Sequence, residues 1–136
     1  IRALADADQP VIAAGGGGIP VMEQGSHLKG ASAVIEKDRA AGLLAKELDA
    51  DVLMFITGVP NVVLNYGSDH PINIDKMTTA DAARYAEEGH FKTGSMLPKV
   101  ESSIDFINAG KGRRAIITSL DGAKSALAGK GGTTIQ

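Results

Sequence analysis

Residues 89–101 read GHFKTGSMLPKVE, and this stretch predicts a glycine-hinged loop that runs directly into a helix. Apolar residues recur at three- and four-residue spacing from this stretch onward, which is typical of a helix with one buried face. These residues are Leu97, Val100, Ile104 and Ile107. Ser95 is a common helix cap, and Pro98 fits in a first turn, where an N–H has no intrahelical partner. We therefore expect a helix that begins near Ser95.

Lys99 is the unusual residue of this helix start. A cation in the first turn opposes the helix dipole at a cost of about 0.3–1 kcal/mol. An anion bound there would reverse the sign, because free backbone N–H groups, the dipole and the ammonium group would all attract it. The local chemistry favours a phosphate beside Lys99, whereas spacing alone favours a solvated surface lysine.

The length predicts one domain, residues 1–136, and 43% hydrophobic residues are enough for a core; the net charge is −2. The order of its expected strands and helices predicts the α/β class. Acids and bases are interspersed, so we expect no nucleic-acid partner. There is no cysteine, no apolar run as long as a membrane span and no signal peptide, so we expect a cytoplasmic protein. Residues 1–5 read like the end of a helix already in progress, which suggests part of a longer chain.

Short apolar runs alternate with helical patterns along the chain, which predicts βαβ units and a mostly parallel sheet. We expect strands at 10–14, 51–57, 62–65, 114–118 and 133–135, a short extended piece at 19–22 and a polar loop at 23–30. The run at 51–57 is nearly continuous, as in a strand covered on both faces. Thr78 and Asp81 predict a capping box for a helix that ends at Gly89.

Four glycines, at positions 15–18, follow the first expected strand. They can adopt positive φ and offer bare N–H groups to an anion, although their spacing matches neither a Walker A loop nor a dinucleotide fingerprint. A flexible turn without a ligand is the alternative. Because ligands of parallel sheets collect at the carboxyl ends of strands, these glycines, residues 57–61 and Ser119 could share one rim. His27, His70 and His90 show no metal-site spacing and are expected in surface loops.

Asp38 stands beside Lys37 where a second helix should begin. A helix cap is the simpler interpretation of an aspartate in this position. The alternative is a carboxylate that orients lysines around phosphoryl oxygens, the electrostatic clamp that phosphoryl transfer requires. The sequence alone leaves both open.

Four segments together carry a resemblance to a known family. They are AAGGGGIPV at 13–21, VIEKD at 34–38 followed by Ala40 and Ala41, TGV at 57–59, and the stretch 89–101. In this order they resemble the carbamate kinases of the amino acid kinase family, across the whole chain. The resemblance implies an open αβα sandwich and the use of ATP with Mg²⁺ to phosphorylate carbamate. Such enzymes usually run towards ATP, from ADP and carbamoyl phosphate, and the carbamate released decomposes to ammonia and carbon dioxide.

The resemblance also implies roles for individual residues. Lys99 would hold the transferring phosphoryl group, Lys37 would assist, and Asp38 would position the lysines. The nucleotide site would include Gly15, Gly16, Thr57, Gly58, Val59, Met96 and Lys99. No metal ligand is expected among the chain's own residues. Many relatives carry an acidic residue where Gly58 stands, and often where Pro60 stands, so nucleotide contacts differ there.

The resemblance covers about the C-terminal half of the family's length, the nucleotide-binding part. The other half would hold a second glycine loop, a further phosphate-binding lysine, the carbamate site and much of a homodimer interface. We therefore expect the chain alone to bind nucleotide weakly and to be inactive. The alternatives are another amino acid kinase, such as an acylglutamate or uridylate enzyme, and a non-catalytic nucleotide-binding module.

Overall fold

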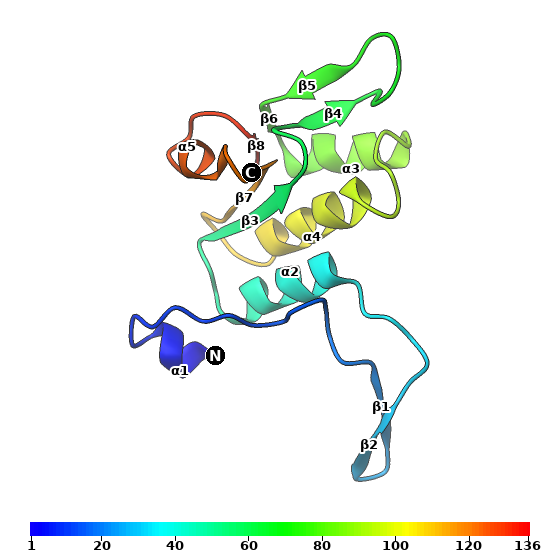
Figure 1. The fold of residues 1–136 in the computed structure, drawn as a ribbon, viewed down its shortest axis with the longest axis vertical. Helices are drawn as coiled ribbons and strands as arrows, with labels where there is room; N and C mark the ends of the chain where they lie inside the picture. Colours follow the sequence, from blue (N-terminus) through cyan, green and yellow to red (C-terminus); the bar gives the residue numbers. More distant parts are fainter.

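A computed structural model describes residues 1–136, in which helices lie side by side along a mixed sheet (Figure 1). The helices are α1 (Arg2–Ala5), α2 (Lys37–Glu47), α3 (Thr79–Glu87), α4 (Met96–Asn108) and α5 (Ala123–Leu127). The strands are β1 (Val21–Gln24), β2 (His27–Gly30), β3 (Val52–Thr57), β4 (Val62–Leu64), β5 (Ile72–Ile74), β6 (Lys76–Met77), β7 (Arg114–Ser119) and β8 (Thr133–Ile135). The α/β class is confirmed.

The main sheet has the strand order β3-β7-β8-β6. The pairs β3–β7 and β6–β8 are parallel, and β7–β8 is antiparallel. Two hairpins, β1–β2 and β4–β5, form separate two-stranded sheets. A mostly parallel sheet is therefore confirmed, with one antiparallel pair. Because β3 and β7 run in parallel register, Thr57 lies opposite Ser119, and the carboxyl ends of these strands form one rim as predicted.

Strand β7 is covered on both faces, because its successive side chains point to opposite sides. Ala115 and Ile117 belong to the core cluster that includes Val100 and Phe106 of α4. Thr118, on the opposite face, lies against Gly122 and Gly132, which flank α5. All of these strand residues are fully buried. At β7 the chain thus has helix, sheet and helix in three layers, as in an αβα sandwich.

Helix α4 lies at the centre of the helical layer, between α2 and α3 (Figure 1). Of its predicted apolar face, Val100 is fully buried, and Leu97, Ile104 and Ile107 are partly buried against the core. Phe106, which the predicted face did not include, is fully buried as well. The capping box of Thr78 and Asp81 is confirmed, since each side chain bonds the other residue's backbone N–H at the start of α3. Gly89 follows α3 with φ +80°, as a helix-ending glycine does.

Strand β3 differs from the prediction of a strand covered on both faces. Leu53 and Phe55 are buried against the helices, but Ile56 on the other face is 44% exposed. The reason is topological: β3 is the edge strand of the sheet, and α5 covers only the neighbouring β7. The apolar run therefore predicted the strand correctly, but it did not show that one face of the strand is left partly exposed.

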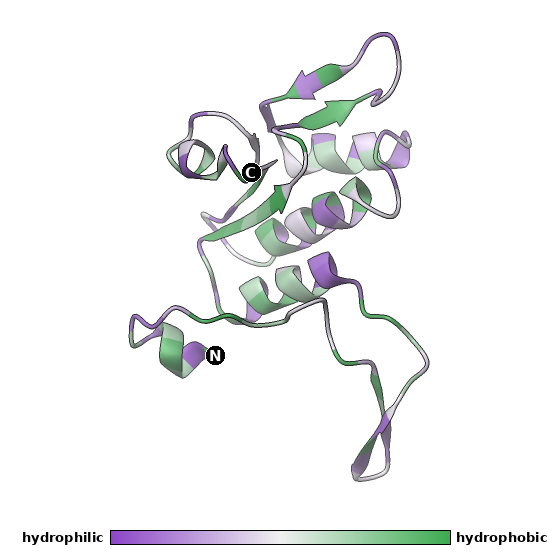
Figure 2. Cartoon of the chain, in the orientation of Figure 1, coloured by the Kyte–Doolittle hydropathy of each residue, from purple (hydrophilic) through white to green (hydrophobic).

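The N-terminal predictions were partly wrong. Residues 10–14 form no strand, and the Ile12 side chain is fully exposed, because no other strand pairs with this run. Residues 23–30 are not merely a loop but belong to the β1–β2 hairpin, which projects from the helical layer (Figure 1). Figure 2 shows several apolar stretches along this segment, and Ile19 and Val34 there are largely exposed. None of the helices has the length and apolar character needed to cross a membrane.

Two fully buried threonines offer a matched test of polar burial. The Thr133 hydroxyl accepts a bond from Val62 N–H and donates one to the Ile74 carbonyl, whereas the Thr118 hydroxyl has no partner. Valine has nearly the same shape as threonine. We predict that Thr133→Val lowers the free energy of unfolding by about 1–3 kcal/mol, while Thr118→Val leaves it unchanged or raises it slightly. Urea unfolding measures both, and equal losses would contradict the assignment.

Candidate active site

A buried ion pair joins the beginnings of α2 and α4. The Lys99 ammonium nitrogen lies 2.6 Å from Oδ2 of Asp38, and the two residues are only 8% and 6% exposed. The same ammonium group lies 3.4 Å from the Ser95 carbonyl oxygen. The alternative of a solvated surface lysine is therefore wrong. Lys99 has a fixed position that its carboxylate partner sets.

The two helices can approach closely one turn further along because of Gly42. A Cβ atom on Gly42 would lie 3.0 Å from the Ser102 Cβ atom on α4, which is tighter than ordinary van der Waals contact. On the exposed side, Arg39 and Glu101 form a second pair between the helices, with N and O atoms 2.5 Å apart. Gly42 thus permits the close approach of the two helices, and the two ion pairs join them.

Lys37 brings a second ammonium group to the same carboxylate. Its nitrogen lies 3.6 Å from Oδ2 of Asp38 and 3.0 Å from Oε1 of Glu36. The hydrogen bond to Glu36, and then the charge of Asp38, raise the pKa of Lys37, so it stays protonated. The structure therefore places Asp38 between Lys37 and Lys99, the arrangement needed if Asp38 is to orient both lysines.

The helix-cap interpretation of Asp38 is wrong, because Glu36 caps α2. The Glu36 carboxylate accepts bonds from the backbone N–H groups of Asp38, at 2.6 Å, and Arg39, at 3.0 Å. Asp38 itself lies inside the first turn, facing α4. Ser95 does precede α4 as predicted, but its side chain makes no capping bond.

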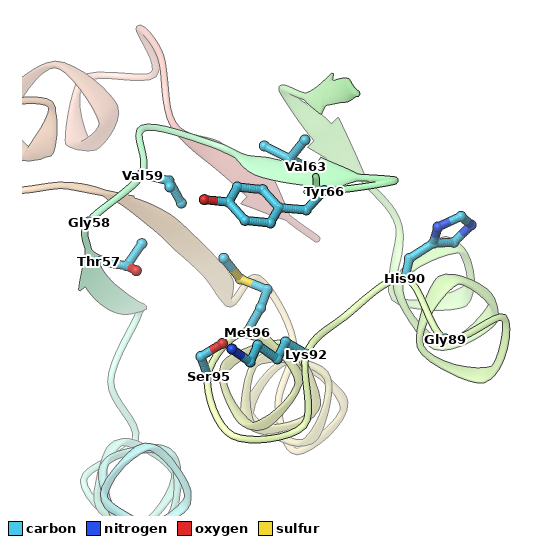
Figure 3. Close-up of a pocket in the computed structure, with 10 residues that line it drawn as sticks. All are labelled: Thr57, Gly58, Val59, Val63, Tyr66, Gly89, His90, Lys92, Ser95 and Met96. Atoms are coloured by element: carbon cyan, nitrogen blue, oxygen red, sulfur yellow. The ribbon is translucent and has the colours of Figure 1, made fainter. Parts of the chain in front are cut away.

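A cavity of about 630 Å³ opens between the end of β3, the β4–β5 hairpin and the beginning of α4 (Figure 3). Its lining residues are Thr57, Gly58, Val59, Val63, Tyr66, Gly89, His90, Lys92, Ser95 and Met96. Four of the residues predicted for a nucleotide site are among them, namely Thr57, Gly58, Val59 and Met96. The volume suits a small organic ligand, since such pockets span about 300–1,000 Å³.

Lys99 does not line this cavity, but it lies directly behind it. Ser95 and Met96 form part of the cavity wall, and the Lys99 ammonium group contacts the Ser95 carbonyl. The buried ion pair and the cavity therefore meet at the first turn of α4. A ligand that fills the cavity and extends along this turn would approach the ion pair.

The glycine-rich segment lies elsewhere than predicted. It follows no strand, and a Cβ atom on Gly17 would lie 2.2 Å from the Ile35 carbonyl oxygen, so the segment packs against the approach to α2. Gly17 has φ +142°, which favours glycine. Gly15 and Gly16 are exposed, and neither lines the cavity. Any role for them in ligand binding stays a prediction.

Sequence reasoning missed Val63, Tyr66, Gly89, His90, Lys92 and Ser95 as cavity residues. Four of them belong to the stretch 89–101, so its loop could have been predicted to line a site. Tyr66 gave no such signal, because it lies in a turn that the β4–β5 pairing brings to the cavity. His90 is not simply a surface residue, since its ring packs edge-on against Tyr85 and its Nε2 lies 3.3 Å from Glu88.

The carboxylates do not form a metal site. No group of three or more histidine, aspartate or glutamate side chains is arranged to hold a metal ion. Asp38 is already engaged by Lys99 and Lys37, and no carboxylate lines the cavity. The residues of this chain thus provide no preformed cluster of three metal ligands.

The fold and the site together define an α/β domain with a cluster of two lysines around the Asp38 carboxylate beside a cavity. Comparison with known proteins identifies the family. The profile described as "Amino acid kinase family" matches residues 1–119, and the chain belongs to that family.

Relatives with carbamate kinase names are similar over the whole chain. "Carbamate kinase-like protein YqeA" of Escherichia coli is 50% identical over 99% of the chain, and "Carbamate kinase 2" of Staphylococcus aureus is 45% identical over 100% of it. The chain spans about 44% of the length of both. A solved structure of carbamate kinase from Giardia lamblia bound to AMP-PNP is 41% identical, with a TM-score of 0.93 over 98% of this chain and 42% of that one.

The buried ion pair predicts a large thermodynamic coupling. Asp38→Asn leaves the buried Lys99 ammonium group without its countercharge and should lower the free energy of unfolding by about 3–5 kcal/mol. Lys99→Met leaves the Asp38 carboxylate with only the Lys37 ammonium group, 3.6 Å away, so its loss should be smaller. The double variant should lose clearly less free energy of unfolding than the sum of the two single losses. Urea unfolding at pH 7 measures all three. Additive losses would show that the pair is not coupled.

The cap of α2 should make stability depend on pH. Burial acts to raise the Glu36 pKa, but hydrogen bonds from Lys37 and from the Arg39 and Asp38 backbones outweigh it and lower the pKa. The stabilising contribution is therefore complete above the unfolded value, about 4.3, and is lost as the pH falls through the lower folded value. We predict that Glu36→Gln is less stable than the wild type at pH 7 and equally stable near pH 2. A pH-independent difference in urea unfolding would contradict this.

Proposed function

We propose that the complete protein containing this chain is a carbamate kinase, and that this chain is its C-terminal, nucleotide-binding half. The observation that carries the proposal is the Lys37–Asp38–Lys99 cluster at two helix beginnings, directly behind a ligand cavity. It is supported by relatives that carry this name at 45% identity and by a solved carbamate kinase bound to an ATP analogue.

In this proposal the cavity binds the base and ribose of ADP or ATP. Val59, Val63 and Met96 supply apolar contacts, and the exposed ring of Tyr66 is available to stack on a base. Thr57 and Gly58 at the end of β3 offer backbone and hydroxyl groups for hydrogen bonds. The phosphates would then extend along the first turn of α4 towards the lysine cluster.

The reaction transfers a phosphoryl group between carbamoyl phosphate and ADP. An oxygen of the ADP β-phosphate bonds to phosphorus, the bond from phosphorus to the carbamate oxygen breaks, and the electron pair leaves with carbamate. Charge on the transferring group is stabilised by fixed cations and helix N-termini. Lys99 would contact this group and Lys37 would assist, while Asp38 holds both in place without moving during the reaction.

The rest of the protein would supply what this chain lacks. We propose that it holds the carbamate site, a further phosphate-binding lysine and much of a homodimer interface. Mg²⁺ would enter with the nucleotide, bound through phosphate oxygens, since this chain offers it no set of carboxylates. We further propose a cytoplasmic location for the enzyme.

The test is ATP formation from ADP and carbamoyl phosphate by the purified complete protein, measured in a coupled assay. Lys99→Met should lower kcat by at least about 10²-fold, the typical loss when one transition-state donor is removed. Lys111→Met, in an exposed turn, is the matched control and should retain activity. Because Lys99→Met also removes a buried charge, assays are run below the melting temperature of each variant. Near-normal kcat in folded Lys99→Met would contradict the role of Lys99.

A non-catalytic nucleotide-binding protein is the second candidate. The relative at 50% identity is named only "Carbamate kinase-like protein", a name that states a likeness rather than an activity. The same assay separates the two candidates: ADP binding without ATP formation by the wild-type protein would favour the second.

A further inference from the structure

The cavity carries a cation but no acid, although the net charge of the chain is −2. Among its ten lining residues, Lys92 provides the only ammonium group, and there is no carboxylate. The nearest acid along the chain, Glu88, is paired with His90 and with Arg84. The lining therefore offers a ligand one cation and no carboxylate, which favours an anionic group over a cationic one.

Lys92 differs from the other two lysines near the site. Lys37 and Lys99 both have carboxylate partners, whereas none of the ion pairs in the structure includes Lys92. Its side chain is exposed. An ammonium group without a countercharge can bind a ligand anion without first breaking an internal ion pair.

The backbone of Lys92 is nevertheless well anchored. Its carbonyl accepts hydrogen bonds from the N–H groups of Ser95 and Leu97, both at 3.1 Å. These bonds tie the loop to the first turn of α4. In Figure 3, Lys92 extends from this loop along the same side of the cavity as Ser95 and Met96. The ammonium group therefore starts from a fixed point and reaches along the wall of the cavity.

We propose that Lys92 is a nucleotide-binding residue, whose ammonium group contacts a phosphate of the ADP or ATP bound in this cavity. This inference rests on the proposed function, because it takes the ligand to be a nucleotide. Lys92 acts in binding and not on the group being transferred, which is the part assigned to Lys99. Its effect therefore depends on the phosphates of the ligand and not on the base.

The experiment compares ADP with adenosine, using calorimetry on the complete protein. Lys92→Met should weaken ADP binding about tenfold, as expected for one partly screened charge-assisted hydrogen bond, and leave adenosine binding within about twofold. Lys92→Arg should restore most of the ADP affinity. Lys111→Met, the matched control, should bind both ligands as the wild type does. In ATP formation, Lys92→Met should raise KM for ADP and leave kcat nearly unchanged.

Salt dependence supplies a second readout. ADP affinity of the wild type should fall more steeply with added KCl than that of Lys92→Met, because exposed charges are screened. Equal slopes would overturn the proposal. So would unchanged ADP affinity in Lys92→Met, or an equal loss for ADP and adenosine, which would indicate a role in cavity shape.

Failure of the proposed function is distinguishable from failure of this inference. If the wild type binds ADP but forms no ATP, the kinase proposal fails, while the comparison of ADP with adenosine still tests the inference on Lys92. If the wild type binds neither ligand, the nucleotide assignment fails and the inference on Lys92 is overturned with it. If ATP forms and Lys92→Met behaves as the wild type, only the inference on Lys92 is overturned.

Discussion

The buried ion pair between Asp38 and Lys99 is the interaction on which the rest of the structure depends. Removing two charges from water is costly, and such a pair is tolerated only when its geometry is good and other polar contacts complete it. That requirement fixes the separation of α2 and α4 at their first turns. Gly42 makes the separation possible, and the Arg39–Glu101 pair closes the exposed side. The position of the site thus follows from how the two helices pack.

The stretch 89–101 connects this constraint to the fold and to the cavity. Gly89 ends α3, and Phe91 is buried in the core, only 5% exposed. Ser95 and Met96 line the cavity, and Lys99 enters the ion pair one turn later. Because α4 also packs between α2 and α3 against the sheet, a substitution in this stretch would alter both the packing of the core and the geometry of the site.

Local signals predicted local structure well, and long-range pairing decided what they missed. The apolar period of α4, the capping box of Thr78 and Asp81, and strand β7 depend on neighbouring residues and were predicted correctly. The strand expected at 10–14 failed because no other strand pairs with it. The residues around Asp38 left a cap and a lysine partner both open, because Lys99 is far away in sequence, and Tyr66 reaches the cavity only through the β4–β5 hairpin. Neither the partner of a charge nor the cover of a strand can be read from one segment.

The electrostatics of the site also explain why the lysine cluster alone does not make the cavity attractive to an anion. Lys37 and Lys99 are balanced by Glu36 and Asp38, so the cluster carries no net charge. In the proposed function its effect on the transferring group would come from the fixed orientation of the lysines and from the first turn of α4. Such an arrangement favours charge that develops close to it, and it attracts a distant anion only weakly. In the proposed function, the unpaired ammonium group of Lys92 on the cavity wall would complement the cluster by binding the phosphates of the ligand.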